Sequence, residues 1–197
     1  MTILHLSDTH GLHRQLANLP DADVIVHSGD FTMAGSTAET VDFINWFCDL
    51  PYRHKMFIAG NHDACLYGAS LNGLDANCHY LCNSGICIDG VNFYGVPMFM
   101  EDAMNGKCDE HIKSIPDDTD VFVTHQPPFG ILDFADGIHY GNKELMNKVE
   151  AVKLKAHLFG HIHNEYGVTQ WHGTVFSNAA LMNDGYALTN KPRMICV

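Results

Sequence analysis

The chain contains five short apolar runs, and each is followed by a polar turn. Their length of roughly 4–8 residues and their content of Val, Ile and Phe are typical of strands buried inside a sheet. The sequence therefore predicts five core strands, at residues 2–7, 23–28, 55–60, 120–125 and 157–163.

Between the first three runs, apolar residues recur at helical spacing. Residues 12–19 carry leucines at this spacing, which predicts a helix. Residues 36–39, Ser-Thr-Ala-Glu, match a helix capping box. The helix that it begins is predicted to bury one face, formed by Val41, Ile44 and Phe47.

The second half of the chain is richer in hairpins. Residues 86–89 and 91–96 flank Gly90 and predict a hairpin, residues 143–152 predict a short helix, and residues 172–178 and the last residues of the chain predict further strands. Strand, helix and strand alternate earlier in the chain, so the pattern predicts an α/β fold of mixed sheets with helices outside. No repeat or linker divides the chain, and we expect one domain over residues 1–197.

Composition narrows the class of protein. Hydrophobic residues make up 46% of the 197, as in ordinary globular proteins, and no apolar run approaches the roughly 20 residues of a membrane span. The N-terminal residues lack the pattern of a secretion signal, so we expect a cytoplasmic protein. A net charge of −12 disfavours long nucleic acids and anionic membranes as partners. The oligomeric state stays open.

Seven cysteines without a signal peptide predict free thiols in a reducing compartment. Cys78, Cys82 and Cys87 lie within ten residues of one another, so a zinc site is conceivable. No second pair with zinc-finger spacing accompanies them, and small buried or half-buried thiols are the favoured interpretation.

Polar residues at the strand ends are the strongest functional signal. Ligands of open α/β folds bind beyond the carboxyl ends of strands. Taken singly, each of these residues could be a turn, a helix cap or a hydrogen-bonded core residue. One shared site explains all of them together, and its members are Asp8, His10, Asp30, Asn61, His62, His125, His161 and His163.

Carboxylate oxygens with imidazole nitrogens suit Zn, Mn or Fe, and seven ligands are too many for one tetrahedral ion. A pair of divalent ions about 3.5–4 Å apart can clamp both oxygens of an in-line displacement at phosphorus. His161 and His163 stand two positions apart and, on a strand, would face the same side. Spacing alone leaves a hydrogen-bonded pair, one ion or two ions open.

Five blocks in this order resemble the signature of the calcineurin-like metallophosphoesterase superfamily: SDTHG at 7–11, SGDF at 28–31, AGNHD at 59–63, THQPP at 124–128 and GHIH at 160–163. The residues within these blocks are similar to those of a small subgroup, the metallophosphoesterase-domain phosphodiesterases. The resemblance implies a four-layer αββα sandwich of two mixed β-sheets flanked by helices, with the metals at the sheet edge.

The resemblance also implies roles for residues. One metal would be bound by Asp8, His10 and His163, the other by Asn61, His125 and His161, with Asp30 bridging them. His62 would sit over the substrate and either protonate the leaving group or stabilise charge on the phosphoryl oxygens, and Asp63 would orient His62. Some animal members of the subgroup lack the histidine that corresponds to His161, which weakens their second metal.

We therefore expect a dinuclear metal-dependent phosphodiesterase that hydrolyses small diesters, such as cyclic nucleotides, through a metal-bridging hydroxide. The alternatives are a phosphomonoesterase or protein phosphatase, and a non-catalytic interaction scaffold on the same fold. Phe31 and Phe129 are expected as an apolar wall of the substrate site, and the loop with His139 and Tyr140 could overhang it. His13, in the first predicted helix, is interpreted as structural.

Overall fold

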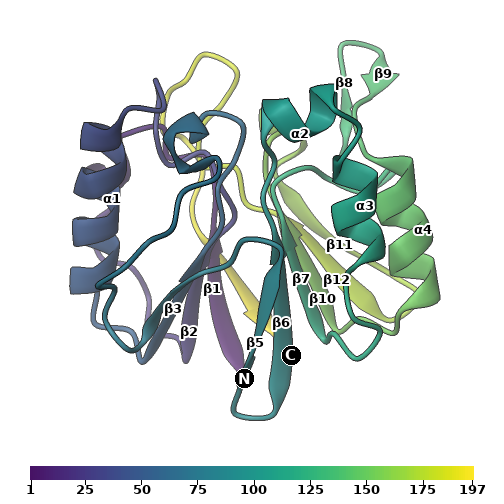
Figure 1. Cartoon of the computed structure of the whole chain (residues 1–197), viewed down its shortest axis with the longest axis horizontal. Coiled ribbons are helices and arrows are strands. Elements are labelled where there is room, and N and C mark those ends of the chain that lie inside the picture. The colour runs from purple at the N-terminus through teal and green to yellow at the C-terminus, as the bar shows by residue number, and fades with distance from the viewer.

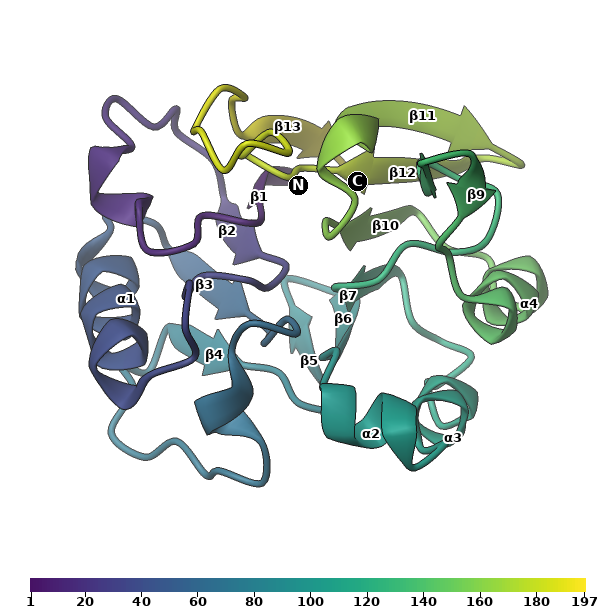
Figure 2. The same ribbon diagram turned by 90° about the horizontal axis from the view of Figure 1, so that it is seen from above.

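Two mixed β-sheets pack face to face, and helices cover both outer faces (Figure 1, Figure 2). The computed structural model describes all residues, 1–197. One sheet has the strand order β13 (Arg193–Cys196), β1 (Thr2–Leu6), β2 (Val24–His27), β3 (His54–Phe57) and β4 (Cys78–Tyr80). Within it β1 to β4 are parallel, and β13 is antiparallel to β1.

The second sheet has the order β11 (Gly167–Trp171), β12 (Thr174–Asn178), β10 (Ala156–Phe159), β7 (Val121–Thr124), β6 (Val91–Val96) and β5 (Ser84–Ile88). Its four central strands are parallel and its two edge strands antiparallel. Helix α1 (Thr37–Asp49) covers the first sheet, while α2 (Met100–Met104), α3 (Cys108–Lys113) and α4 (Lys143–Ala151) cover the second (Figure 1). The predicted αββα sandwich is confirmed.

A further two-stranded hairpin, β8 (Phe134–Ala135) and β9 (Ile138–His139), stands apart from both sheets. Three 3₁₀ turns complete the elements: η1 (His13–Gln15), η2 (Ala64–Leu66) and η3 (His163–Glu165). The hairpin predicted around Gly90 is present, because β5 and β6 pair antiparallel across it.

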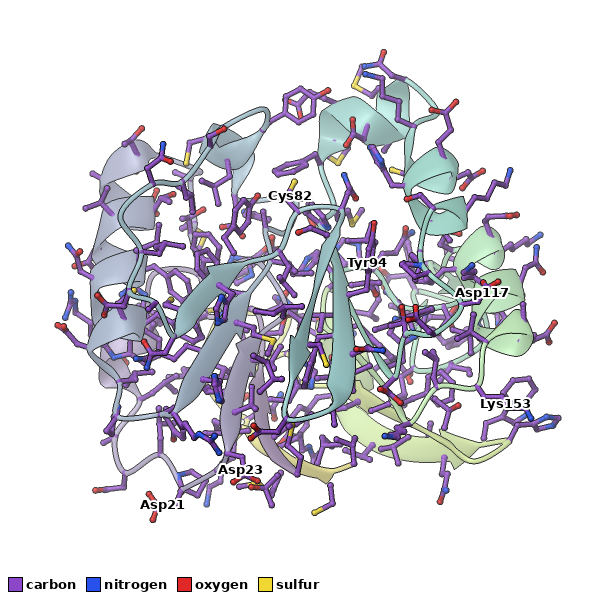
Figure 3. The ribbon with its side chains drawn as sticks, turned by 60° about the horizontal axis from the view of Figure 1, so that its bottom comes forward. Asp21, Asp23, Cys82, Tyr94, Asp117 and Lys153 are labelled. Atoms are coloured by element: carbon purple, nitrogen blue, oxygen red, sulfur yellow. The ribbon has the colours of Figure 1, made fainter.

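The sheets share a largely apolar core, and side chains fill the layers on both sides of each sheet (Figure 3). Val24 and Val26 point between the sheets, whereas Ile25 points towards α1. A parallel strand buried on both faces needs an apolar side chain at nearly every position. This is why the core strands appear in the sequence as continuous apolar runs.

The capping box that begins α1 is confirmed, since Ser36 accepts from the Glu39 amide and Glu39 bonds back to Ser36. The predicted buried face is confirmed at Phe47 and is wrong at Val41, which is 50% exposed, while Ile44 is only partly buried. The helix residues that are buried against the sheet are Thr40, Phe43, Trp46 and Phe47. The stacking of Phe43 on Phe31, 4.1 Å between ring centroids, helps to set the rotation of this helix.

The helix predicted over residues 12–19 was also wrong: only η1 forms there. Asn18 adopts a left-handed conformation with φ 55°, which ends any regular helix. Leu16 and Leu19 still pack against the core under α1, so their spacing reflects burial without a helix. His13 is buried and bonds Asp42, which supports its structural interpretation.

All seven cysteines are unpaired. Cys78 is buried, Cys82 and Cys87 are exposed, and none of them belongs to a group of closely spaced potential metal ligands. No helix combines the length and the apolar character that crossing a membrane requires.

A buried neutral histidine in β10 predicts acid sensitivity. Burial, and then the nearby His5, lower the pKa of His157 to about 3. Between pH 6.5 and 3 the unfolded chain binds a proton here that the folded chain does not. Stability therefore falls as the pH falls through this window, by about 1.4 kcal/mol per pH unit for this residue.

Replacing His157 by leucine should remove this contribution. Between pH 7 and pH 5 the wild type should lose about 2 kcal/mol more unfolding free energy than His157→Leu, as measured by urea titration of metal-stripped protein. The Thr124 hydroxyl that contacts His157 keeps a second partner, the Gln126 carbonyl. His172→Asn, at an exposed turn, is the control and should keep the wild-type slope. Equal slopes in wild type and His157→Leu would contradict the prediction.

Candidate metal centre

The predicted ligands come from five strands of two sheets and meet at one place. They follow the carboxyl ends of β1, β2 and β3 in one sheet and of β7 and β10 in the other. A cavity of about 470 Å³ opens beside them, and its wall includes His10, Asp30, Asn61, His62, His161 and His163. Packing of the two sheets thus brings together residues up to 155 positions apart in the sequence.

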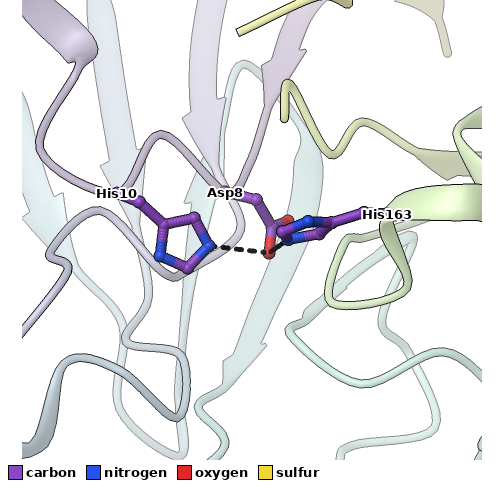
Figure 4. Close-up of side chains that lie close together, drawn as sticks. All are labelled: Asp8, His10 and His163. Atoms are coloured by element: carbon purple, nitrogen blue, oxygen red, sulfur yellow. Dashed lines mark hydrogen bonds and ion pairs between the residues drawn. The ribbon is translucent and has the colours of Figure 1, made fainter. Parts of the chain in front are cut away.

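One group of potential ligands consists of Asp8, His10 and His163 (Figure 4). The Nε2 atom of His163 lies 3.3 Å from Oδ1 of Asp8, and Nε2 of His10 lies 3.8 Å from the same oxygen. Asp8 is fully buried and His10 nearly so. Two imidazole nitrogens thus converge on one buried carboxylate.

A second group consists of Asp30, His125 and His161. Nε2 of His125 lies 3.2 Å from Oδ2 of Asp30. The same Asp30 oxygen is 3.8 Å from Nε2 of His10, which belongs to the first group. Asp30 therefore lies between the two groups, in the position from which one carboxylate can serve both.

Backbone carbonyls orient three of the histidines. The Nδ1 atoms of His10, His125 and His163 bond the carbonyls of Thr32, Ser28 and Asn183, at 3.2, 2.8 and 3.1 Å respectively. A carbonyl can only accept, so each Nδ1 carries the proton and donates it. When the ring carries no second proton, Nε2 presents its lone pair to the centre, as in metal-binding histidines.

The backbone is strained at four of the site residues. Asp8, His10, Asp30 and His161 all have positive φ, between 39° and 70°. Such conformations cost of the order of 1–3 kcal/mol each and persist only where the surrounding structure enforces them. They occur together here because the chain turns sharply after each strand, and this turn directs the side chain towards the centre.

Two glycines allow the strand-end turns to approach one another. A Cβ atom at Gly60 would collide with the Asp30 carboxylate, and one at Gly160 would collide with Asp8 and Ser7. The glycines of the AGNHD and GHIH blocks are thus explained by close approach rather than by an unusual φ.

The stretch around His161 differs from the sequence prediction. Strand β10 ends at Phe159, His161 is left-handed with φ 70°, and His163 begins η3. The two histidines therefore do not share one face of a strand, and that prediction was wrong. They fall into the two different ligand groups because the turn between them separates their rings.

Electrostatics keep both carboxylates ionised. Burial alone would raise the pKa of Asp8, but the His163 hydrogen bond and the positive charge of His125 hold it below its ordinary value. Burial is likewise opposed at Asp30, where the charge of His125 lowers the pKa. Asp30 in turn outweighs burial and raises the pKa of His125 to about 10. The extra proton on His125 thus places positive charge beside Asp30, where a bound cation would also neutralise the carboxylate.

The residues present fit divalent metal ions. Three buried polar atoms of the centre have no hydrogen-bond partner in the protein: Nε2 of His10, Oδ1 of Asn61 and Nε2 of His125. Buried polar atoms without partners are costly and rare in folded proteins. Oxygen and imidazole nitrogen donors together match Zn, Mn or Fe, so a cation explains atoms that the fold alone leaves unsatisfied.

His62 and Asp63 have different partners from those predicted. Nδ1 of His62 bonds the Met33 carbonyl at 2.9 Å, not Asp63. The Asp63 carboxylate instead accepts from the backbone amides of Asp30, Thr32 and Gly60 at 2.8 to 2.9 Å. Asp63 is fully buried beneath the turn, so it cannot turn towards the His62 ring and holds the Asp30 backbone instead.

Several cavity residues were not found from the sequence. They are Ala135, Asp136, Ile162, Asn164, Asp184 and Tyr186. Tyr140 also lines the cavity, as was expected of its loop. Phe31, expected in the wall, is fully buried under α1, and Phe129 lines a separate hollow beside Trp171. Both phenylalanines are neighbours of proposed ligands in the sequence, but their side chains face away from the cavity because adjacent residues of each turn point in different directions.

An αββα sandwich with Asp, Asn and His side chains gathered at the strand ends is the arrangement of metal-dependent phosphoesterases. Comparisons with known proteins support this class. The sequence profile of the calcineurin-like phosphoesterase family matches residues 1–165. A crystal structure with a TM-score of 0.60 covers 90% of this chain and 89% of its own at 12% identity, which shows the shared fold.

Relatives narrow the assignment. A UPF0046 protein of Caenorhabditis elegans is 39% identical over 209 residues, covering 89% of this chain and 73% of that protein. Human metallophosphoesterase domain-containing protein 1 is 32% identical over 225 residues, covering 96% and 69%. The chain therefore belongs to the calcineurin-like phosphoesterase family, as its five sequence blocks indicated, and is a metal-dependent hydrolase of phosphoesters.

Proposed function

We propose that this protein is a dinuclear phosphodiesterase of small diesters, cyclic nucleotides among them. The observation that carries the proposal is the pair of ligand groups that meet at Asp30. In this proposal Asp8, His10 and His163 hold one divalent ion, Asn61, His125 and His161 hold the other, and Asp30 bridges. Divalent ions bound there would supply Lewis-acid charge and lower the pKa of a coordinated water.

The residues of the chain then have distinct tasks. His62 contacts the substrate: its Nδ1–H is fixed by the Met33 carbonyl, and the imidazolium form, with a second proton on Nε2, can protonate the departing alcohol. Asn61 contributes its amide oxygen to the same region, since that atom has no partner in the protein. Asp63 acts as a positioning residue, because it holds the backbone of Asp30 and Thr32.

The charge of the cavity favours diesters. None of its lining residues is Lys or Arg, and its wall includes Asp136 and Asp184. A phosphomonoester carries nearly one negative charge more than a diester at neutral pH, since its second pKa is about 6. With no basic side chain to neutralise that charge, only bound cations could do so, and the two carboxylates would oppose it.

A comparison of two aryl esters tests this preference. Bis(p-nitrophenyl) phosphate and p-nitrophenyl phosphate release the same leaving group and should be assayed side by side with Mn, Zn and Fe after metal stripping. We expect kcat/KM to favour the diester by about tenfold or more, equivalent to about 1.4 kcal/mol. EDTA-treated protein is the blank. Faster turnover of the monoester would favour the phosphatase alternative, and no hydrolysis of either would favour the scaffold.

The compartment is a separate proposal. Seven unpaired cysteines, two of them exposed next to the β5–β6 hairpin, fit a reducing environment. We propose the cytoplasm on that basis.

A further inference from the structure

The cavity beside the ligand groups is completed by two segments outside the five sequence blocks. Ala135, Asp136 and Tyr140 belong to the hairpin of β8 and β9 and to the residues that follow it, and Asp184 and Tyr186 belong to a turn near the C-terminus. Figure 1 shows both segments at the end of the molecule where the parallel strands end. The turn lies beyond residues 1–165, the part that the family profile matches. The family profile alone therefore does not account for it.

The turn, residues 183–187, is tightly ordered by Asn183. The Oδ1 atom of Asn183 accepts from the amides of Gly185 and Ala187, both at 3.0 Å. The Tyr186 amide donates to the Asn183 carbonyl at 2.9 Å, and the Asn183 amide donates to the Ala187 carbonyl at 3.0 Å. The Asn183 carbonyl also accepts from Nδ1 of His163. The turn is thus built onto the ligand group that contains His163.

This turn holds Tyr186 in a conformation that a bulky residue rarely adopts, with φ 56°. Strain of this kind in an exposed aromatic residue points to a functional constraint. The ring is 43% exposed, so burial in the core does not account for its position.

The Tyr186 ring stands against the metal-centre histidines. Its centroid lies 5.0 Å from that of His10 and 5.5 Å from that of His163, with interplanar angles of 72° and 76°. The centroid of His62 is 6.4 Å away. Tyr186 therefore rests on two proposed metal ligands and adjoins the proposed proton donor, with part of its surface open to the cavity.

We propose that Tyr186 determines specificity by forming a stacking surface for a flat aromatic group on the substrate. The proposal rests on the proposed phosphodiesterase function and adds a substrate class: diesters whose retained alcohol carries an aryl ring or a nucleobase. Aromatic rings stack face to face with an offset or edge to face, and such pairs add to plain burial. Tyr140 adds a second aromatic wall to the same cavity. The absence of Lys and Arg there fits an uncharged ring better than a second phosphate.

Two diesters with one leaving group test the proposal. Water attacks phosphorus and p-nitrophenolate departs from both bis(p-nitrophenyl) phosphate and methyl p-nitrophenyl phosphate, which differ only in the alcohol that stays. The quantity measured is the ratio of kcat/KM for the aryl over the methyl ester. We expect Tyr186→Leu to lower this ratio about 2- to 10-fold, mainly through KM, and Tyr186→Phe to preserve it.

Tyr67→Leu is the matched control, because Tyr67 is similarly exposed (38%) and lies outside the cavity. Metal content, measured by plasma mass spectrometry, must be equal in all variants, since Tyr186 touches His10 and His163. An unchanged ratio in Tyr186→Leu, or an equal drop in Tyr67→Leu, would overturn the proposal. A preference of the wild type for p-nitrophenyl phosphocholine that is lost in Tyr186→Leu would also overturn it, because the ring would then bind a cationic group of the substrate.

A binding measurement separates this proposal from the proposed function. Phenyl phosphate and methyl phosphate should be titrated calorimetrically into the manganese-loaded wild type and Tyr186→Leu. We expect the wild type to prefer phenyl phosphate and the variant to lose most of that preference. If no diester is hydrolysed but this difference persists, the catalytic proposal fails and the stacking surface stands. If hydrolysis occurs without the difference, the stacking surface fails alone.

Discussion

Replacing His161 by alanine is expected to remove one of the two proposed metal ions and nearly all turnover. His161 belongs to the group with Asp30 and His125. Burial, and then the charge of His125, lower the pKa of His161 to about 4, so its ring is neutral at pH 7 and a lone pair is available to a metal. Alanine removes that donor and leaves only oxygen ligands and His125 for the ion.

We expect the loss in kcat to be of the order of 100-fold or more. Mutation of residues that only hydrogen-bond to metal ligands already costs about 10- to 100-fold in activity, and His161 is itself a proposed ligand. Metal per chain, measured by plasma mass spectrometry after gel filtration, should fall from two ions towards one. His111→Ala, on α3 and paired with Asp102 outside the cavity, should retain both ions and full turnover. If His161→Ala kept the wild-type metal content and rate, the assignment of this residue would be wrong.

The second large effect is expected at His62. Its Nδ1 is held by the Met33 carbonyl, and its ring stands 4.7 Å from that of His10, at the cavity wall. In the proposed function His62 contacts the substrate, and it is not one of the proposed metal ligands even though it forms a third group of potential ligands with His10 and Asp30. His62→Gln should therefore keep two ions per chain and lose about 10²- to 10⁴-fold in kcat, the usual contribution of general acid catalysis.

The dependence on the leaving group distinguishes proton donation from charge stabilisation. p-Nitrophenolate departs with little help from an acid, whereas a phenolate or alkoxide needs a proton. The deficit of His62→Gln should therefore grow from bis(p-nitrophenyl) phosphate to diphenyl phosphate. An equal deficit for both esters would favour stabilisation of the phosphoryl oxygens. An unimpaired kcat for both esters would exclude both roles.

Much of the fold could be predicted from the sequence because buried parallel strands need continuous apolar runs. The runs at residues 23–28 and 120–125 became β2 and β7, each shorter by one residue at either end. The capping box before α1 was equally clear, because it is a local set of hydrogen bonds. The helix over residues 12–19 failed because leucines that pack singly on a core can mimic helical spacing.

The proposed ligand set could be predicted from the sequence for a similar reason. Each of its residues directly follows an apolar strand, and the ends of parallel strands lie at one edge of a sheet. The partner of His62 was not readable, since Met33 contributes a backbone carbonyl, which any residue could provide. Tyr186 and Asn183 were missed because the turn at residues 183–187 comes several residues after β12 and carries none of the five sequence blocks.

By itself, the sequence determined the strands, the polar residues at their ends and the family, since these depend on local composition and order. Only the tertiary structure decided how those residues are grouped. His161 and His163 are neighbours in the chain but enter different ligand groups, because the left-handed turn at His161 and the start of η3 redirect their rings. The cavity wall at Tyr186 likewise arises from a distant turn that the packing of the two sheets brings to the same edge.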